Sequence, residues 1–230
     1  MRILHKILLS AFMILLLPAI AAGRDYTYNV GPFDKLSERG NINIIYRCVP
    51  DSSGIVKYTS DRDFGKALEI TNEKGKLFIK ETRHNLGEVP TVYVYSHYLT
   101  NISLDGDATI QADMTAKTPK FGVSLTGNGR IEVSGLDVSQ IKASYTAGNG
   151  QIILTGTTQT AKFNLTGAGR IEADNLQARN VSCTVIGGGD IYCWSTTKLD
   201  ITGIGTTRIH YKGCPEIKKV GGATVAPIPE

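Results

Sequence analysis

The chain has 230 residues, of which 25 are glycine and 7% are aromatic, and its 25 Lys and Arg outnumber its 21 Asp and Glu by only four. This near-neutral balance excludes the strongly basic proteins that bind nucleic acid or anionic membranes through their net charge. The length suits one all-β domain with a sizeable core, and the glycine content is typical of a β protein with many tight turns.

Residues 1–22 have the three parts of a secretory signal peptide. Two basic residues precede an apolar run from Ile7 to Leu17, and Ala19 and Ala21 occupy the A-x-A positions that signal peptidase recognises. The apolar run is shorter than the roughly 20 residues of a membrane-spanning helix, so we predict a cleaved signal and not an anchor. The protein is then exported to the periplasm or the cell surface and keeps no integral membrane segment. Which side of the outer membrane it occupies is left open.

Residues 23–222 are predicted to form a single domain, followed by a tail at 223–230. Within this domain, residues 23–100 repeat poorly and contain strand-like runs at 42–46, 68–70, 77–80 and 90–95, separated by polar turns. We interpret this region as irregular first coils that also cap one end, because an exposed sheet edge invites aggregation.

Residues 101–213 contain a repeat of about 20 residues. An isoleucine follows each glycine-containing turn, with spacings of 21, 21, 19, 20 and 18 residues: Ile110, Ile131, Ile152, Ile171, Ile191 and Ile209. Before each turn, apolar and polar residues alternate as in a half-buried strand. The apolar positions repeat with the same period: Phe121, Val123 and Leu125, then Ile141, Ala143 and Tyr145, then Ala161, Phe163 and Leu165, then Val181, Cys183 and Val185.

This pattern predicts an all-β fold, a single-stranded right-handed β-helix (β-solenoid). Each coil is too small to bury its own apolar face, whereas stacked coils bury one continuous core and place like residues above like. An antiparallel sandwich of regular hairpins is the alternative.

Four cysteines permit disulfides in an exported chain. The register turns Cys183 and Cys193 inward, where they either bridge the interior of one coil or remain free as small buried hydrophobes. The cysteines and histidines lack the spacing of a zinc site. We predict no metal and no cofactor.

Outward-facing polar residues provide the candidate ligand face. The threonines are expected to form a ladder of hydroxyls, and an arginine follows two of the same turns: Thr126, Thr146, Thr166 and Thr202, with Arg130 and Arg170. A hydroxyl ladder on a flat face can bind an ordered ligand such as a glycan. Threonine is also favoured in strands for its own sake, so the ladder alone does not establish a site.

A β-helix can also be a polysaccharide lyase or hydrolase, which needs carboxylates that converge on one sugar. Glu132 and Glu172 share a phase but are two coils apart, nearly 10 Å at about 4.8 Å per strand, and each lies close to an arginine. Asp107, Asn128 and Asn149 share a turn phase, which favours turn geometry over a weak calcium site. The sequence has no G-x-S-x-G motif. We predict that the protein is not an enzyme.

Several motifs resemble the putative auto-transporter adhesin head GIN domain family. They are the repeated turns Thr126-Gly-Asn-Gly-Arg-Ile131 and Thr166-Gly-Ala-Gly-Arg-Ile171, the opening Phe33-Asp-Lys-Leu36 with Gly40-Asn-Ile42, and the closing Ile209-His-Tyr-Lys-Gly-Cys-Pro215. The resemblance covers roughly residues 28–222. It implies an exported β-helical domain of the kind found in Bacteroidetes, with adhesion as its inferred role.

We therefore expect a non-enzymatic cell-envelope protein that acts as an adhesin-like binding or structural module through its β-helix faces. Its partner is expected to be a glycan or a surface protein, and not nucleic acid. The alternative is a carbohydrate-active β-helix enzyme. The ligand and the oligomeric state are left open.

Overall fold

The computed structural model describes residues 23–229 except 52–53, 61–67 and 83–90. The predicted signal peptide lies outside these residues. The described chain contains strands and no helix. The seven strands before residue 100 are β1 (Arg24–Asn29), β2 (Lys35–Gly40), β3 (Ile44–Cys48), β4 (Ile55–Ser60), β5 (Leu68–Glu73), β6 (Lys76–Glu81) and β7 (Val92–Ser96).

The later strands include four long ones, each of which runs through both faces of the fold. The strands are β8 (Asn101–Gly106), β9 (Thr109–Asp113), β10 (Thr118–Thr126), β11 (Arg130–Thr146), β12 (Gln151–Gly167), β13 (Arg170–Gly187), β14 (Asp190–Gly205), β15 (Arg208–Lys212), β16 (Glu216–Gly221) and β17 (Thr224–Pro227).

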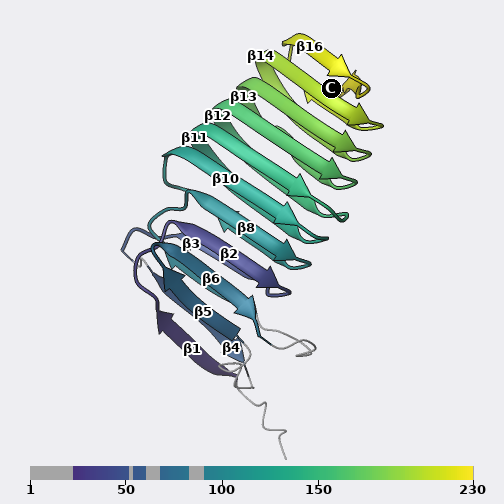
Figure 1. Ribbon diagram of the computed structural model, residues 1–230. Helices are drawn as coiled ribbons and strands as arrows, with labels where there is room; N and C mark the ends of the chain where they lie inside the picture. The colour runs from purple at the N-terminus through teal and green to yellow at the C-terminus, as the bar shows by residue number, and fades with distance from the viewer. Residues whose placement is uncertain (1–22, 52–53, 61–67, 83–90, 230) are drawn as a thin grey trace, which may run out of the picture.

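The strands form a flattened β-solenoid with two faces, as Figure 1 shows. The front sheet faces the viewer in Figure 1 and has the order β5-β6-β2-β8-β10, followed by the second halves of β11 to β14 and then β16. The back sheet has the order β1-β4-β7-β3-β9, followed by the first halves of β11 to β14, then β15 and β17. Glycine-rich turns join the two sheets along one edge, which we call the glycine edge.

The core lies between the two sheets and is built from the two apolar series that the sequence predicts. In the front sheet, Phe121, Val123 and Leu125 are each no more than 2% exposed and pair with Ile141, Ala143 and Tyr145 of the next coil. In the back sheet, the repeated isoleucines from Ile110 to Ile209 are fully buried. Parallel stacking repeats the same environment at each coil, so the repeated residue types and the parallel register confirm the predicted solenoid.

The glycine edge depends on a backbone conformation that side chains resist. Gly187 has φ +128°, and a Cβ there would lie 2.5 Å from the carbonyl oxygen of Gly167 in the preceding coil. Such an approach is closer than van der Waals contact allows, so glycine is required both for the positive φ and for the close stacking.

The order of the first coils differs from the order of the sequence. β2 lies between β6 and β8 in the front sheet, and β3 lies between β7 and β9 in the back sheet. The coil of β2 and β3 is therefore an inner one, and β4 to β7, which follow it in the chain, lie outside it. The end of the solenoid is covered by β1, β4 and β5, which pair antiparallel to their neighbours. Capping by residues 23–100 is thus achieved by β1, their first strand, together with β4 and β5, and not by the coil of β2 and β3.

The other end is closed by short strands. β15 and β16 continue the back and front sheets, and β17 then pairs with β15. Since β17 (Thr224–Pro227) lies within residues 223–230, half of the segment that we predict as a tail is a strand of the solenoid.

Candidate binding surface on the front sheet

Thr126, Thr146 and Thr166 stand in one column on the outer surface of the front sheet. They pair directly across β10, β11 and β12, and all three are exposed. Neighbouring strands are about 4.8 Å apart, so their hydroxyl groups repeat at that interval. Among the described residues no side-chain hydrogen bond engages these three hydroxyls, which are therefore free for a ligand.

A second polar column runs beside the first, two residues earlier in each strand. Ser124, Ser144 and Asn164 form it in the same three strands, and Thr184 and Thr202 continue it in β13 and β14. The Asn164 side-chain Nδ2 donates a hydrogen bond to the Ser144 hydroxyl at 3.3 Å. The two columns together form a flat array of donors and acceptors.

The register corrects one member of the predicted ladder. Thr202 lies in the second column, and the position that continues Thr166 is occupied by Ile186 and then Ile204. These isoleucines are 51% and 73% exposed. The prediction was wrong at this point because the last coils are shorter than 20 residues. Thr202 therefore lies two residues before the position that continues Thr166.

Arg130 and Arg170 lie on the other face of the solenoid. Each follows a glycine turn and begins a back-sheet strand, so the turn separates it from the threonine that precedes it. The arginines and the threonines flank the same edge but do not form one ligand face.

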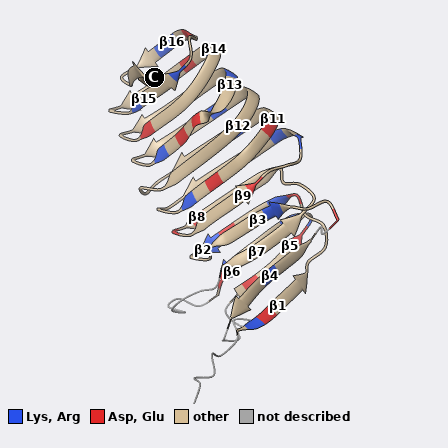
Figure 2. Cartoon of the chain, turned by 180° about the vertical axis from the view of Figure 1, so that it is seen from behind, with Lys and Arg blue, Asp and Glu red and all other residues tan. Residues whose placement is uncertain are grey.

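The arginines belong to a ladder of ion pairs on the back sheet. Arg130 contacts Glu132 at 3.2 Å and donates to the side-chain oxygen of Gln151, whose Nε2 donates to Glu172 at 2.7 Å. Arg170 contacts Glu172 at 3.4 Å. Acidic and basic positions are interspersed along this side (Figure 2).

The ladder ends on a buried carboxylate. Asp190 is 8% exposed and accepts two hydrogen bonds from Arg208, at 2.7 and 3.2 Å, while Arg170 approaches it at 3.7 Å. Beside it, the rings of Tyr192 and His210 stack with centroids 4.5 Å apart. Glu132 and Glu172 are thus bound to arginine and amide groups, which accounts for them as structural members of the ladder.

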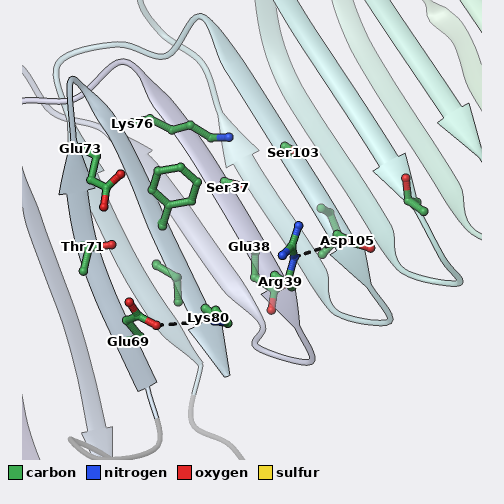
Figure 3. A pocket seen from close by; sticks show the side chains of 14 residues that line it. Ser37, Glu38, Arg39, Glu69, Thr71, Glu73, Lys76, Lys80, Ser103 and Asp105 are labelled. Carbon is green, nitrogen blue, oxygen red and sulfur yellow. Dashed lines mark hydrogen bonds and ion pairs between the residues drawn. The ribbon is translucent and has the colours of Figure 1, made fainter. Parts of the chain in front are cut away.

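A cavity of about 450 Å³ lies at the N-terminal end of the front sheet (Figure 3). β5 supplies Glu69, Thr71 and Glu73, and β6, β2 and β8 supply residues that continue the two polar columns. Thr126 also lines it, so the cavity is continuous with the hydroxyl array. Sequence reasoning missed this site because its walls come from the poorly repeating region.

The side chains of the cavity carry both signs of charge. Arg39 donates to Asp105 at 3.1 Å, and Lys80 lies 3.8 Å from Glu69. The Lys76 ammonium lies 4.4 Å from the centre of the Phe78 ring. The cavity thus combines a half-buried aromatic ring with charged groups of both signs.

Glu38 is a carboxyl group buried behind this cavity. It is fully buried, its Oε1 accepts a hydrogen bond from the Ile42 amide at 3.1 Å, and its Oε2 has no partner among the described residues. Burial raises the pKa of Glu38 from 4.5 to about 8, the Ile42 amide opposes this rise, and the negative charges of Glu81 and Asp105 add to it. Glu38 is therefore protonated at neutral pH.

The turn residues considered for calcium bind one another. The Asp107 Oδ1 accepts from the Asn128 main-chain and side-chain nitrogens at 3.1 and 3.0 Å, and the Asn128 Oδ1 accepts from the Asn149 amide at 3.0 Å. This ladder ties adjacent turns together. In the described part of the chain, no group of three or more acidic, histidine or cysteine side chains is arranged to hold a metal ion.

Cys183 and Cys193 lie in the core, and both thiols are free in this structure. A hydrogen bond with Cys193, together with burial, raises the pKa of the Cys183 thiol. The disulfide between the two thiols stays a prediction.

The fold is shared with solved structures. An adhesin-like protein from Bacteroides fragilis, named a putative adhesin, is 25% identical, with a TM-score of 0.78 over 89% of this chain and 96% of its own. A protein from Parabacteroides distasonis, named a putative lipid binding protein, is 22% identical, with a TM-score of 0.71 over 90% of this chain and 97% of its own. A putative adhesin from Parabacteroides merdae is 20% identical, with a TM-score of 0.65 over 90% and 96%. The last two similarities concern the fold alone.

No curated protein matches the sequence significantly. In the residues that the structure describes, no helix is long and apolar enough to cross a membrane. The family described as putative auto-transporter adhesin, head GIN domain, matches residues 32–215. With that match over most of its length and the solenoid just described, the chain belongs to the head GIN domain family of adhesin-like proteins.

Proposed function

We propose that this protein is an exported, non-enzymatic binding module of the cell envelope, and that it holds a glycan along the outer surface of its front sheet. The observation that carries this proposal is the pair of polar columns at constant spacing, which continues into the cavity at the N-terminal end. Its membership of an adhesin-like family supports a binding role.

A regular array of hydroxyls matches a ligand that is itself regular. The free hydroxyls of Thr126, Thr146 and Thr166 repeat at about 4.8 Å, and each can donate one hydrogen bond and accept two. An extended polysaccharide presents hydroxyls along its whole length, so many weak contacts can add up without a deep pocket.

The test is retention of the purified protein on an array of mucin-type and bacterial polysaccharides, with product release followed by mass spectrometry. We expect retention without released oligosaccharides. The double variant Thr146→Val and Thr166→Val removes two hydroxyls while keeping strand-favouring side chains, and we expect it to bind about tenfold more weakly. The control is Thr157→Val, at an exposed position outside both columns. Release of oligosaccharides would instead support the carbohydrate-active enzyme.

A second candidate is binding of a lipid. Ile186, Ile204 and Val220 are 51%, 73% and 57% exposed and lie on the last coils of the front sheet, and a structural neighbour is named a putative lipid binding protein. Exposed aliphatic clusters are typical of interaction sites. Binding of phospholipid vesicles that is lost in Ile204→Ser, with retention on glycans unchanged, would favour this candidate.

A further inference from the structure

Three lysines gather on the front sheet beside the polar columns. Lys142 and Lys162 pair directly across β11 and β12, and Lys120 lies on β10 next to them. All three are exposed. With Gln140 and Thr160, they surround a hollow of about 250 Å³. We call these three lysines and the hollow the lysine site.

The floor of the lysine site is closed by the core. Phe121 and Ile141 line it and are each 2% exposed. A hollow of this size is smaller than the clefts that enclose drug-sized ligands. It has room for one sugar ring or one charged substituent, surrounded by ammonium groups from three successive coils.

The charges of the lysine site are not neutralised by the protein. Among the described residues, Lys120, Lys142 and Lys162 take part in no ion pair, whereas Arg130 and Arg170 on the back sheet both contact carboxylates. Like charges directly opposite one another on adjacent strands destabilise a sheet. The stacked Lys142 and Lys162 therefore weaken the free protein, and an anion between them would relieve the repulsion.

We propose that the lysine site binds the acidic substituents of a glycan, which are carboxylate or sulfate groups. This inference rests on the proposed function and narrows its ligand to acidic polysaccharides. Lys142 and Lys162 occupy the same strands as Ser144 and Asn164, two residues earlier. A chain lying on the hydroxyl columns thus brings its substituents to the ammonium groups, where hydrogen bonds between charged partners are stronger than neutral ones.

The placement of the lysines favours a glycan over an anionic membrane. The residues at the rim of the lysine site are charged or polar, and the two apolar residues that line it, Phe121 and Ile141, are buried at its floor, so no apolar side chain projects from the site to enter a bilayer. The exposed isoleucines of the front sheet begin at Ile186, on β13, beyond the lysines.

The experiment compares titrations of the full protein with four polymers: dextran sulfate, dextran, polygalacturonate and methyl-esterified polygalacturonate. We expect each acidic polymer to bind at least tenfold more tightly than its neutral counterpart, with affinity that falls as salt rises. In the double variant Lys142→Gln and Lys162→Gln, we expect that preference to disappear. The matched control, Lys218→Gln and Lys219→Gln, removes the same charge from β16. This variant should keep the preference for acidic polymers.

A second measurement separates a binding defect from a folding defect. Because the two lysines repel one another, Lys162→Gln should melt at the same or a higher temperature than the parent protein. A lower melting temperature would contradict the repulsion on which the inference depends.

The outcomes also separate this inference from the proposed function. Equal binding of acidic and neutral polymers, lost in the Thr146→Val and Thr166→Val variant, would overturn the lysine site and leave the glycan module standing. Acidic preference that survives in the Lys142→Gln and Lys162→Gln variant would place the site elsewhere. Binding to phosphatidylserine vesicles but to none of the four polymers would overturn both.

Discussion

Replacing Glu38 by glutamine should remove a strong pH dependence of stability. The carboxyl group is fully buried and its pKa is raised from 4.5 to about 8. Between these values the folded protein holds a proton that the unfolded chain has lost, so stability must fall as the pH rises through this range. The contribution of the protonated Glu38 carboxyl group to the free energy of unfolding is fully present below pH 4.5 and is lost above about pH 8.

The size of the effect follows from the shift. One pKa unit corresponds to about 1.4 kcal/mol. Most of the pH range in which Glu38 is protonated only in the folded protein lies between pH 5.5 and pH 8.5. Over that interval, the free energy of unfolding should decrease by about 3 kcal/mol on account of Glu38 alone. Glutamine retains the oxygen that accepts from the Ile42 amide and resembles the neutral acid in shape. Glu38→Gln should therefore match the parent protein at pH 5.5 and exceed its stability by about 3 kcal/mol at pH 8.5.

Urea denaturation at pH 5.5 and pH 8.5, followed by circular dichroism, measures this difference. The control is Glu69→Gln, which removes a half-exposed carboxylate that lies 3.8 Å from Lys80. Its two free energies should differ by the same amount as those of the parent, since exposed ion pairs contribute little. Parallel pH dependence of Glu38→Gln and the parent protein would refute the assignment of a buried proton to Glu38.

Three further predictions concern the core, the glycine edge and the cysteines. Phe163→Asp, at a position 1% exposed, should abolish cooperative thermal unfolding because it buries an unpaired charge; a cooperative transition at the parent temperature would contradict the inward register. Gly187→Ala should lower the melting temperature, because its Cβ meets a carbonyl oxygen at 2.5 Å and its φ is positive; an unchanged melting temperature would count against the tight glycine edge. Iodoacetamide should label the exposed Cys214 in the native reduced protein but label Cys183 and Cys193 only after unfolding, and native labelling of either buried thiol would show that the core opens.

Much of the solenoid could be predicted because its coils repeat. An apolar residue recurs every 20 residues at Phe121, Ile141 and Ala161, and the three occupy one buried column. Parallel stacking places the same position of each coil in the same environment. The same reasoning identified Thr126 and its partners as outward-facing. The sequence also shows that Lys142 and Lys162 occupy the same position in successive coils. Only the structure shows that they line a hollow.

What the sequence by itself determined is therefore the local unit: its period, its glycine turns, and which residues of each strand face inward. Only the tertiary structure decided how these units are arranged. The insertion of β2 between β6 and β8 depends on contacts far apart in the chain, which no local period encodes. The turns carry Arg130 to the face opposite Thr126, and the shortened last coil moves Thr202 out of the threonine column. The cavity beside Glu38 likewise exists only where β5 packs antiparallel on β6, because a binding surface is made by strands that are neighbours in space and not in sequence.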